Sequence, residues 1–260
     1  MTSTPQDVLQ HNRRAWDVQV ARKNPWTLPV DSAAIERARH GDWSIVLTPT
    51  KSVPRDWFPP LRGLATLCLA SGGGQQGPIL AAAGANVVVF DNSPRQLDQD
   101  RMVANRDQLV LDTVQGDMTN LSVFPDERFD LIVHPCSNGF VPDVRPVWKE
   151  AHRVLRTGGT LLSGFVNPLL YLFDYPALEQ GEFSLVHRIP FSDVNDSTDE
   201  EKAALVEADE PFSFGHTLED LIGGQTEAGF AIIGFYEDVL PGFRLSHYIS
   251  SCAATRAKKS

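Results

Sequence analysis

An alternation of short apolar runs with helix-forming segments constrains the fold more than any other feature of this sequence. Runs of strand length occur five times in its middle part, at 64–70, 87–91, 109–115, 129–134 and 160–165. Short apolar runs of this kind are typical of strands that are buried on both faces. Helical segments between them predict βαβ units, so we expect an α/β fold with a parallel sheet and helices on both faces.

The segment before this core reads as mainly helical. Residues 6–23 have helical apolar spacing, and a second helix is predicted from an N-cap at Asp31 to a stop at Gly41. Residues 43–47 read as a short strand. We therefore expect an N-terminal helical extension ahead of the sheet.

A connector with four prolines, at 48–60, follows this extension. Proline fixes φ and lacks a backbone donor, so the connector is predicted to be extended. We place the domain boundary there, which gives an extension or cap over 1–60 and a main domain over 61–260.

The regular alternation stops after the fifth strand. Residues 167–215 include an acidic stretch and read as an insertion, either a solvated surface segment or a lid over a substrate. A helix is predicted over 217–229, and two closing strands over 231–238 and 245–254. The predicted fold is thus a Rossmann-like, doubly wound, mostly parallel seven-stranded sheet with an antiparallel closing pair.

A glycine-rich turn lies between the first strand and the first helix of the core. Gly72, Gly74 and Gly77 fit the pattern G-x-G-x-x-G, in the strand–turn–helix context that gives it meaning. Glycine permits close approach of a ligand, and free N–H groups at a helix start favour an anionic group. Asp91 ends the next strand, where a carboxylate can accept from ribose hydroxyls. These features predict a cofactor that contains adenosine, and both NAD and S-adenosylmethionine fit them.

The next strand end separates these two cofactors. Gly116-Asp117-Met118 follows the third strand, and RVLRTGGTLL precedes the fifth. With the glycine turn, these motifs resemble the class I S-adenosylmethionine-dependent methyltransferases. ASGGGQQGPILAAAGA and VVVFDNSPRQL are similar, more narrowly, to a bacterial branch of the type 11 methyltransferase family.

The resemblance implies S-adenosylmethionine as cofactor, with Asp91 on its ribose and Asp117 on its adenine amino group. The residues expected to bind the cofactor are Ala70, Ser71, Gly72, Gly74, Gln76, Asp91, Asn92, Gly116, Asp117, Met118 and His134.

Two positions depart from the family motif. Cys68 stands where relatives carry an acid that helps to organise the methionine end of the cofactor, and Ala70 replaces the first glycine. Ser71, Gln75 or Gln76 is our candidate for a substitute polar group. The alternative for both glutamines is an exposed position in the first turn of a helix.

Methyl transfer needs orientation above all, and a base only when the acceptor keeps its proton. His134, at the end of the fourth strand, is expected near the sulfonium, as a base or as part of the wall. His216 is the second candidate base, with helix capping as its alternative. Three polar residues after the fifth strand could face the acceptor, and they are Asn167, Tyr171 and Asp174. Three tryptophans could close the pocket from the N-terminal side, and they are Trp16, Trp26 and Trp57.

Composition narrows the classes of partner. The net charge of −10 argues against nucleic acid and anionic membranes as partners. No apolar run has membrane-spanning length, the N-terminus lacks a signal-peptide core, and three cysteines form no disulfide framework. No metal-binding spacing is present. We expect a cytoplasmic protein that binds no metal.

The sequence thus predicts a methyltransferase that moves a methyl group to a small-molecule acceptor by in-line displacement. Two alternatives stay open. One is an NAD(P)-dependent oxidoreductase, and the other is a cofactor-binding module without catalysis, which the changes at Cys68 and Ala70 favour.

Overall fold

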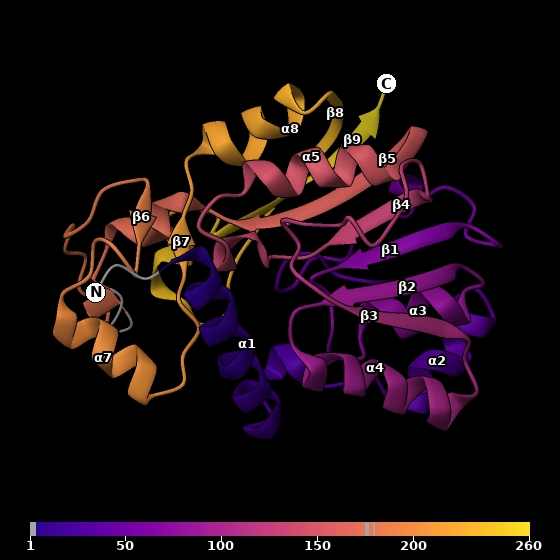
Figure 1. Cartoon of the computed structure of the whole chain (residues 1–260), viewed down its shortest axis with the longest axis horizontal. Coiled ribbons are helices and arrows are strands. Elements are labelled where there is room, and N and C mark those ends of the chain that lie inside the picture. The colour runs from indigo at the N-terminus through magenta and orange to yellow at the C-terminus, as the bar shows by residue number, and fades with distance from the viewer. Residues whose placement is uncertain (1–3, 175–176, 179) are drawn as a thin grey trace.

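One seven-stranded sheet forms the centre of the molecule (Figure 1). In the computed structural model, which describes residues 4–174, 177–178 and 180–260, the strand order is β3-β2-β1-β4-β5-β9-β8. The strands are β1 Ala65–Leu69, β2 Asn86–Asp91, β3 Leu111–Gln115, β4 Phe129–His134, β5 Leu155–Val166, β8 Phe230–Asp238 and β9 Cys252–Lys259. β9 is antiparallel to both β5 and β8, and β1 to β5 are parallel. The predicted Rossmann-like fold with its antiparallel closing pair is confirmed.

Helices cover both faces of this sheet, as Figure 1 shows with α5 and α8 above it and α2, α3 and α4 below. The helices are α1 Pro5–Ala21, α2 Ser32–Arg39, α3 Gln76–Ala82, α4 Pro94–Asp107, α5 Arg145–Val154, α7 Asp199–Glu207 and α8 Gly224–Glu227. All five residues of β1 are buried, because it lies at the centre of the sheet under both helical layers. One core contains Trp148 of α5, and the other contains Leu80 of α3 and Leu97 of α4.

The predicted helix before the fifth strand ends earlier than expected. The sequence suggested that it runs to Gly158-Gly159, but α5 ends at Val154 and β5 begins at Leu155. Backbone N–H groups of Glu127 and Arg128 bond the last carbonyls of the helix, 3.0 Å from Arg153 O and 2.8 Å from Val154 O. The preceding loop therefore takes the acceptors at the helix end, and the chain turns into the sheet.

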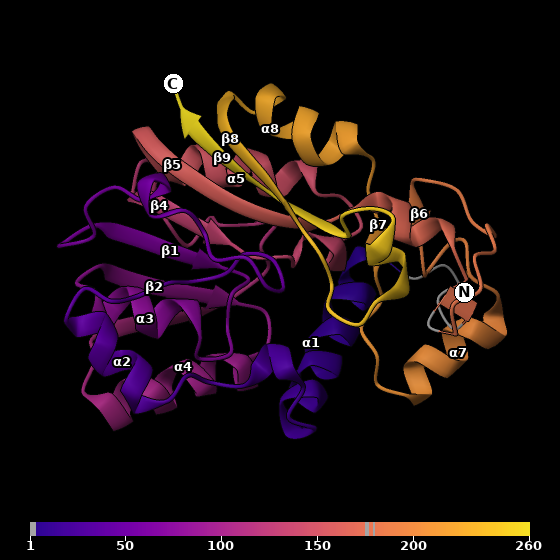
Figure 2. The ribbon, with the colours of Figure 1, turned by 180° about the vertical axis from the view of Figure 1, so that it is seen from behind.

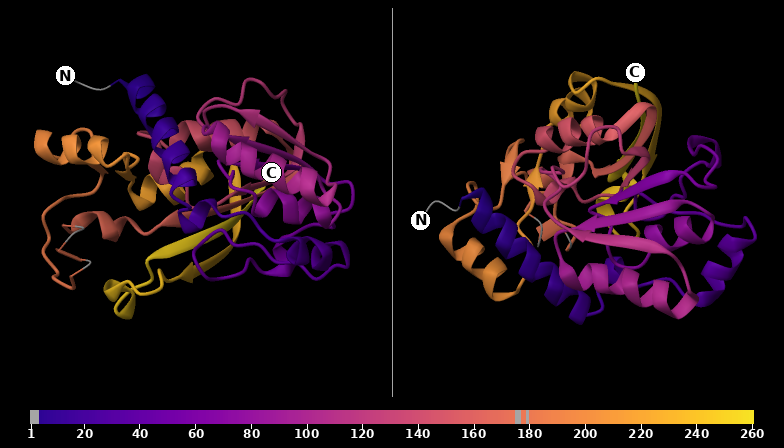
Figure 3. Two further views of the ribbon diagram at one scale, coloured as in Figure 1. Left: turned by 90° about the horizontal axis from the view of Figure 1, so that it is seen from below. Right: turned by 45° about the vertical axis from the view of Figure 1, so that its right-hand side comes forward.

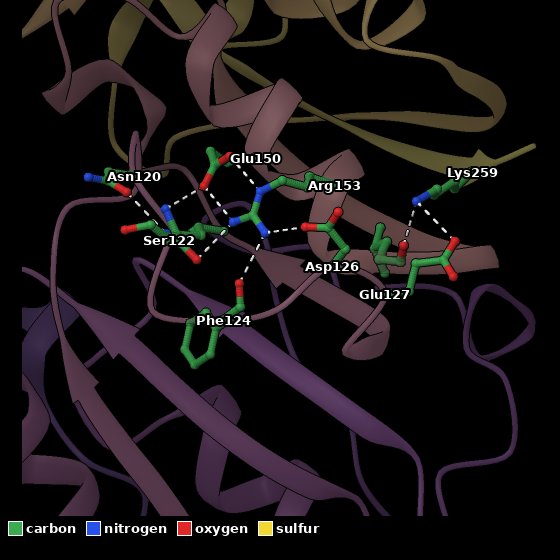
Figure 4. A network of polar contacts seen from close by, with 10 residues as sticks. Asn120, Ser122, Phe124, Asp126, Glu127, Glu150, Arg153 and Lys259 are labelled. Carbon is green, nitrogen blue, oxygen red and sulfur yellow. Dashed lines mark hydrogen bonds and ion pairs between the residues drawn. The ribbon is translucent and has the colours of Figure 1, made fainter.

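Arg153 ties the loop after β3 to α5 (Figure 4). Its guanidinium donates to the carbonyl oxygens of Leu121 and Phe124, at 2.9 and 3.0 Å, and to the carboxylates of Glu150 and Asp126, at 2.7–2.8 Å. Glu150 in turn accepts the N–H of Leu121 at 2.7 Å. This network fixes the loop that carries the chain on from the end of β3.

Two strand predictions differ from the structure: residues 43–47 form no regular strand, and the last strand, predicted over 245–254, runs over Cys252–Lys259. Residues 43–47 form one isolated bridge, Val46 to Ser52, because this segment crosses the rim of the sheet instead of joining it. The last strand begins at Cys252, and the chain before it makes a 3-10 turn at Arg244–His247. Figure 2 shows β8 and β9 side by side next to β5, at one edge of the sheet.

α1 lies between the sheet and the insertion, beside α7 (Figure 3). Asn12 on α1 donates to the carbonyl oxygens of Phe140 and Phe212, both at 3.0 Å, and accepts the N–H of Phe212 at 2.8 Å. Asn92, just after β2, donates to Leu9 O at 3.0 Å. The insertion also contains a two-stranded sheet, β6 Phe191–Ser192 and β7 Phe214–Gly215. α1 therefore connects the strand ends with the insertion.

Residues of the N-terminal extension share a core with the main domain. Ile45, Leu47 and Val53 pack in the same cluster as Cys68 of β1. The boundary at residue 60 stays a prediction. Within the described part of the chain, no helix has the length and apolar character needed to cross a membrane.

Candidate functional site

A cavity of about 740 Å³ opens at the carboxyl ends of the parallel strands. Ligands of open α/β sheets bind at this edge, and pockets for small molecules have volumes of about 300–1,000 Å³. Two N-terminal segments, 25–30 and 44–49, and helix α1 contribute to its walls.

Most residues predicted to bind a cofactor line this cavity. They are Ala70, Ser71, Gly72, Gln76, Asp91, Asn92, Gly116, Asp117 and Met118. Gly74 and His134 are the two predicted residues outside its wall. The turn after β1 and the ends of β2 and β3 thus form one continuous surface at one end of the cavity.

Asp91 holds the glycine turn from the end of β2. Its Oδ2 accepts the N–H of Gly72 at 2.9 Å, and its Oδ1 accepts the N–H of Ser93 at 2.9 Å. Burial raises the pKa of this carboxyl, although the backbone donors oppose that shift. A Cβ at Gly72 would lie 2.7 Å from Cβ of Gln96, so this approach requires glycine. Each carboxylate oxygen keeps a lone pair for a further donor.

Gly116 and Asp117 form the neighbouring wall after β3. The N–H of Gly116 donates to Asp91 O at 3.0 Å, and a Cβ at this position would overlap the ring of Phe90. Asp117 accepts the N–H of Thr119 at 2.9 Å through Oδ1. Two carboxyl groups therefore line the same end of the cavity from adjacent strand ends.

The two glutamines of the turn connect it to the N-terminal segments. Gln76 donates to Val46 O at 3.1 Å, and its Oε1 accepts from Ser71 Oγ at 3.2 Å. Gln75 donates to Leu28 O at 2.9 Å. Both glutamines line the cavity, and Gln76 is buried, so the alternative of an exposed position is wrong for Gln76.

The backbone donors of the turn are already used by the protein. Gly72 donates to Asp91, and Gly73 donates to Oδ2 of Asp100 on α4 at 3.0 Å. The expectation of free N–H groups for an anionic ligand is therefore wrong at these positions. Sequence reasoning missed Asp100, because nothing local marks a carboxylate in the middle of a helix as buried.

His134 lies inside the protein, away from the cavity wall. Its ring is fully buried beside Trp148, and Nδ1 donates to Leu69 O at 2.9 Å. Burial lowers its pKa to about 4. The expected position at the cavity is wrong, because the side chain points into the layer beneath the strand end, and its Nδ1 proton is held by the carbonyl.

His216 is also absent from the described wall. It is buried, its Nε2 lies 3.1 Å from Asn138 O, and burial lowers its pKa. Neither candidate base therefore faces the cavity in this structure.

The opposite end of the cavity lies at the ends of β4, β5 and β9. Side chains here are mostly apolar or weakly polar, and they are Trp16, Pro135, Cys136, Ser137, Phe140, Val141, Val166, Leu170, Leu240 and Cys252. The thiols of Cys136 and Cys252 are hydrogen-bonded, and this contact with burial raises the pKa of Cys136. The thiol of Cys136 therefore stays protonated at neutral pH.

Several residues expected near the acceptor lie elsewhere. Asn167 donates to Ser250 O at 2.9 Å, Tyr171 packs against Gly215, and Asp174 accepts the N–H of Ala177 at 2.7 Å. These contacts are structural, and none of the three predicted side chains is part of the described wall.

Of the three tryptophans expected to close the pocket, two line the cavity and one packs elsewhere. Trp16 and Trp26 line the cavity, whereas Trp57 packs on Tyr236 with 5.2 Å between ring centroids. The wall also contains Phe140, Val141 and Leu240, which sequence reasoning missed because they lie in loops without a motif.

Comparisons with known proteins agree with this architecture. A family model described as a methyltransferase domain matches residues 67–163. The uncharacterized methyltransferase YbaJ of Bacillus subtilis is 54% identical over 252 residues, which cover 97% of this chain and 98% of that protein.

Solved structures of low identity share the fold. An S-adenosylmethionine-dependent methyltransferase from Mesorhizobium loti has a TM-score of 0.59 at 17% identity, covering 78% of this chain and 94% of its own. One from Methanosarcina mazei has a TM-score of 0.54 at 19% identity, covering 78% and 95%. This chain belongs to the methyltransferase family that includes YbaJ, and it shares the fold of solved S-adenosylmethionine-dependent methyltransferases.

Proposed function

We propose that this protein transfers a methyl group to a small-molecule acceptor by in-line displacement. The observation that carries the proposal is one cavity with two chemically different ends. Carboxyl groups line the end at β2 and β3, and apolar side chains line the end at β4, β5 and β9. A donor held at the first end faces an acceptor held at the second.

The first end fits the adenosine part of S-adenosylmethionine. We assign the ribose hydroxyls to Asp91 and the adenine amino group to Asp117, because both groups are donors and both side chains are acceptors on the wall. Gly72 and Gly116 keep this surface open, since a Cβ at either position would collide with its neighbours.

The occupied donors of the glycine turn support a cofactor without phosphate groups. Dinucleotides bind their pyrophosphate through backbone N–H groups at this turn. Here Gly72 and Gly73 give theirs to Asp91 and Asp100, so a pyrophosphate would have to displace two carboxyl groups from their backbone donors. This arrangement disfavours the NAD(P)-dependent alternative.

S-adenosylmethionine supplies an activated methyl group on a sulfonium, and the protein's part is to orient the two reactants and exclude water. Orientation of this kind contributes about 7–11 kcal/mol to lowering a barrier. Gln76 and Ser71 fix the turn against segment 44–49, and Asn12 fixes α1 against the insertion. These contacts enclose the cavity from the N-terminal side.

The acceptor end favours an uncharged, largely apolar molecule. Of the described residues that line the cavity, Asp91 and Asp117 are the two with a charged residue type, and both lie at the cofactor end. A charged acceptor would lose its hydration without gaining an ion pair, which is costly in a buried site.

Among the described residues at the acceptor end, none is placed to act as a general base. His134 and His216 are held by carbonyl oxygens away from the cavity, and the pKa of Cys136 is raised. We infer that the acceptor atom either carries no proton to lose or ionises without help from this protein.

Methyl transfer from a radiolabelled donor tests the proposal. Purified protein is incubated with labelled S-adenosylmethionine and cell-extract metabolites separated by polarity. The expected result is label in a low-polarity, small-molecule fraction. Label in protein or nucleic acid would contradict the acceptor class, and cofactor binding with no transfer to any fraction would favour the non-catalytic alternative.

A further inference from the structure

We propose that Asp100 is a positioning residue that holds the glycine turn in its cofactor-binding shape from behind. Asp100 lies on α4, is fully buried, and is absent from the described cavity wall. Its Oδ2 accepts the N–H of Gly73 at 3.0 Å, a donor that is shared with Gln96 O at 3.1 Å, and the backbone N–H of Gly74 is among the groups that oppose the rise in its pKa caused by burial. This inference rests on the cofactor site of the proposed function.

The backbone of the turn explains why a carboxyl group is needed there. Gly73 and Gly74 have φ angles of +117° and +74°, a conformation that turns consecutive N–H groups toward the interior. Buried donors without an acceptor are costly, and water does not replace Asp100 easily at a fully buried position. The carboxyl group therefore stabilises this shape of the turn over others.

The third glycine of the motif makes room for this side chain. A Cβ at Gly77 would lie 3.2 Å from Oδ1 of Asp100 and 2.6 Å from a methyl group of Val89. The glycine pattern therefore serves two purposes. Gly72 permits the approach of Asp91, and Gly77 permits the approach of Asp100 beneath the turn.

β1 supplies no acid in this region, because Cys68 occupies the first position of the motif. Burial and the nearby Asp100 raise the pKa of the Cys68 thiol, so it stays neutral, and a thiol is a weak acceptor. Asp100 on α4 therefore supplies the carboxyl acceptor for the turn that β1, with Cys68 in this position, does not supply.

Three variants test this role through affinity for S-adenosylhomocysteine, measured by isothermal titration calorimetry at pH 7. Asp100→Ala removes one of the two acceptors of the Gly73 N–H, which keeps Gln96 O, and the carboxyl that faces the N–H of Gly74, so we expect binding about 10-fold weaker. Asp100→Asn keeps one acceptor oxygen, and we expect affinity within about 3-fold of wild type. Asp98→Ala is the matched control, since Asp98 lies on the exposed face of the same helix.

Wild-type affinity in Asp100→Ala would overturn the proposal, and so would equal losses in the alanine and asparagine variants. Amide hydrogen exchange of ligand-free wild type gives a second test that does not need a folded variant. Gly74 should exchange much more slowly than an unstructured peptide, and a rate near that of the peptide would overturn the proposal; Gly73 is no test, because Gln96 O also protects its N–H. If wild type binds no cofactor while the amide of Gly74 is protected, the proposed function fails and the role of Asp100 in shaping the turn stands.

Discussion

Asp91 accepts the backbone N–H of Gly72 through Oδ2 at 2.9 Å, so the end of β2 directly holds the turn after β1. The same carboxyl accepts Ser93 N–H through Oδ1 and thereby also fixes the start of α4. One side chain therefore sets the shape of the cofactor end and lines the cavity.

Asp91→Ala should weaken binding of S-adenosylhomocysteine by 10-fold or more, roughly, because it removes the proposed ribose acceptor and releases the turn. Asp98→Ala should leave affinity within about 2-fold of wild type, since exposed ion pairs contribute little. Calorimetric titration of both variants is the measurement. Equal affinities in the two variants would remove the ribose assignment.

Gly164→Ala should destabilise the protein by about 1–3 kcal/mol. A Cβ at this position on β5 would overlap the backbone of Leu47, where segment 44–49 crosses the sheet. Gly223→Ala is the control, because its Cβ would meet only Glu219 Cγ at 3.6 Å; we expect an unchanged or slightly higher stability. Urea unfolding compares the two, and a Gly164→Ala protein as stable as wild type would show that segment 44–49 does not lie this close.

Arg153→Lys should cost about 1.5–3 kcal/mol, because a lysine cannot reproduce the forked contacts with Glu150, Leu121 and Phe124. Arg101→Lys, in an exposed pair with Asp98, should change stability by less than about 0.5 kcal/mol. Thermal unfolding measures both. Similar small losses would mean that the Arg153 network adds little to the loop after β3.

His134 should make the protein less stable as pH falls. The pKa of His134 is about 4 in the folded protein, below the ordinary 6.5. Between these two pH values the histidine is protonated in the unfolded chain and neutral in the folded protein, so unfolding becomes more favourable as pH falls. Wild type should therefore lose about 2 kcal/mol relative to His134→Asn between pH 7 and pH 4.5. Asparagine keeps a donor for Leu69 O.

Urea unfolding at both pH values checks this expectation. A constant stability difference between wild type and His134→Asn at the two pH values would mean that the ring is reached by solvent and protonated in the folded protein.

The strands of the sheet could be predicted from the sequence because burial on both faces leaves a local signature. β1, β2 and β4 are short apolar runs, and the structure gives them within one or two residues of the expected bounds. The carboxylates at Asp91 and Asp117 could also be predicted, since strand ends fix the positions of the residues that follow them.

The remainder of the site depends on contacts between distant segments. Leu47 approaches Gly164 across 117 residues of sequence, and no local pattern in 43–47 distinguishes a strand from a segment that crosses the rim. His134 ends β4 as expected, but its side chain lies in the interior because its Nδ1 donates to Leu69 O on the neighbouring strand, a contact that no local pattern predicts.

A crystal structure of the complex with S-adenosylhomocysteine tests the central claim most directly. We predict the ribose hydroxyls within hydrogen-bonding distance of the carboxyl of Asp91, the adenine amino group beside Asp117, and the sulfur directed toward Cys136 and Ser137 at the end of β4. An adenosine bound away from the ends of β2 and β3, or a cavity that takes up a nicotinamide dinucleotide and not this ligand, would contradict the account.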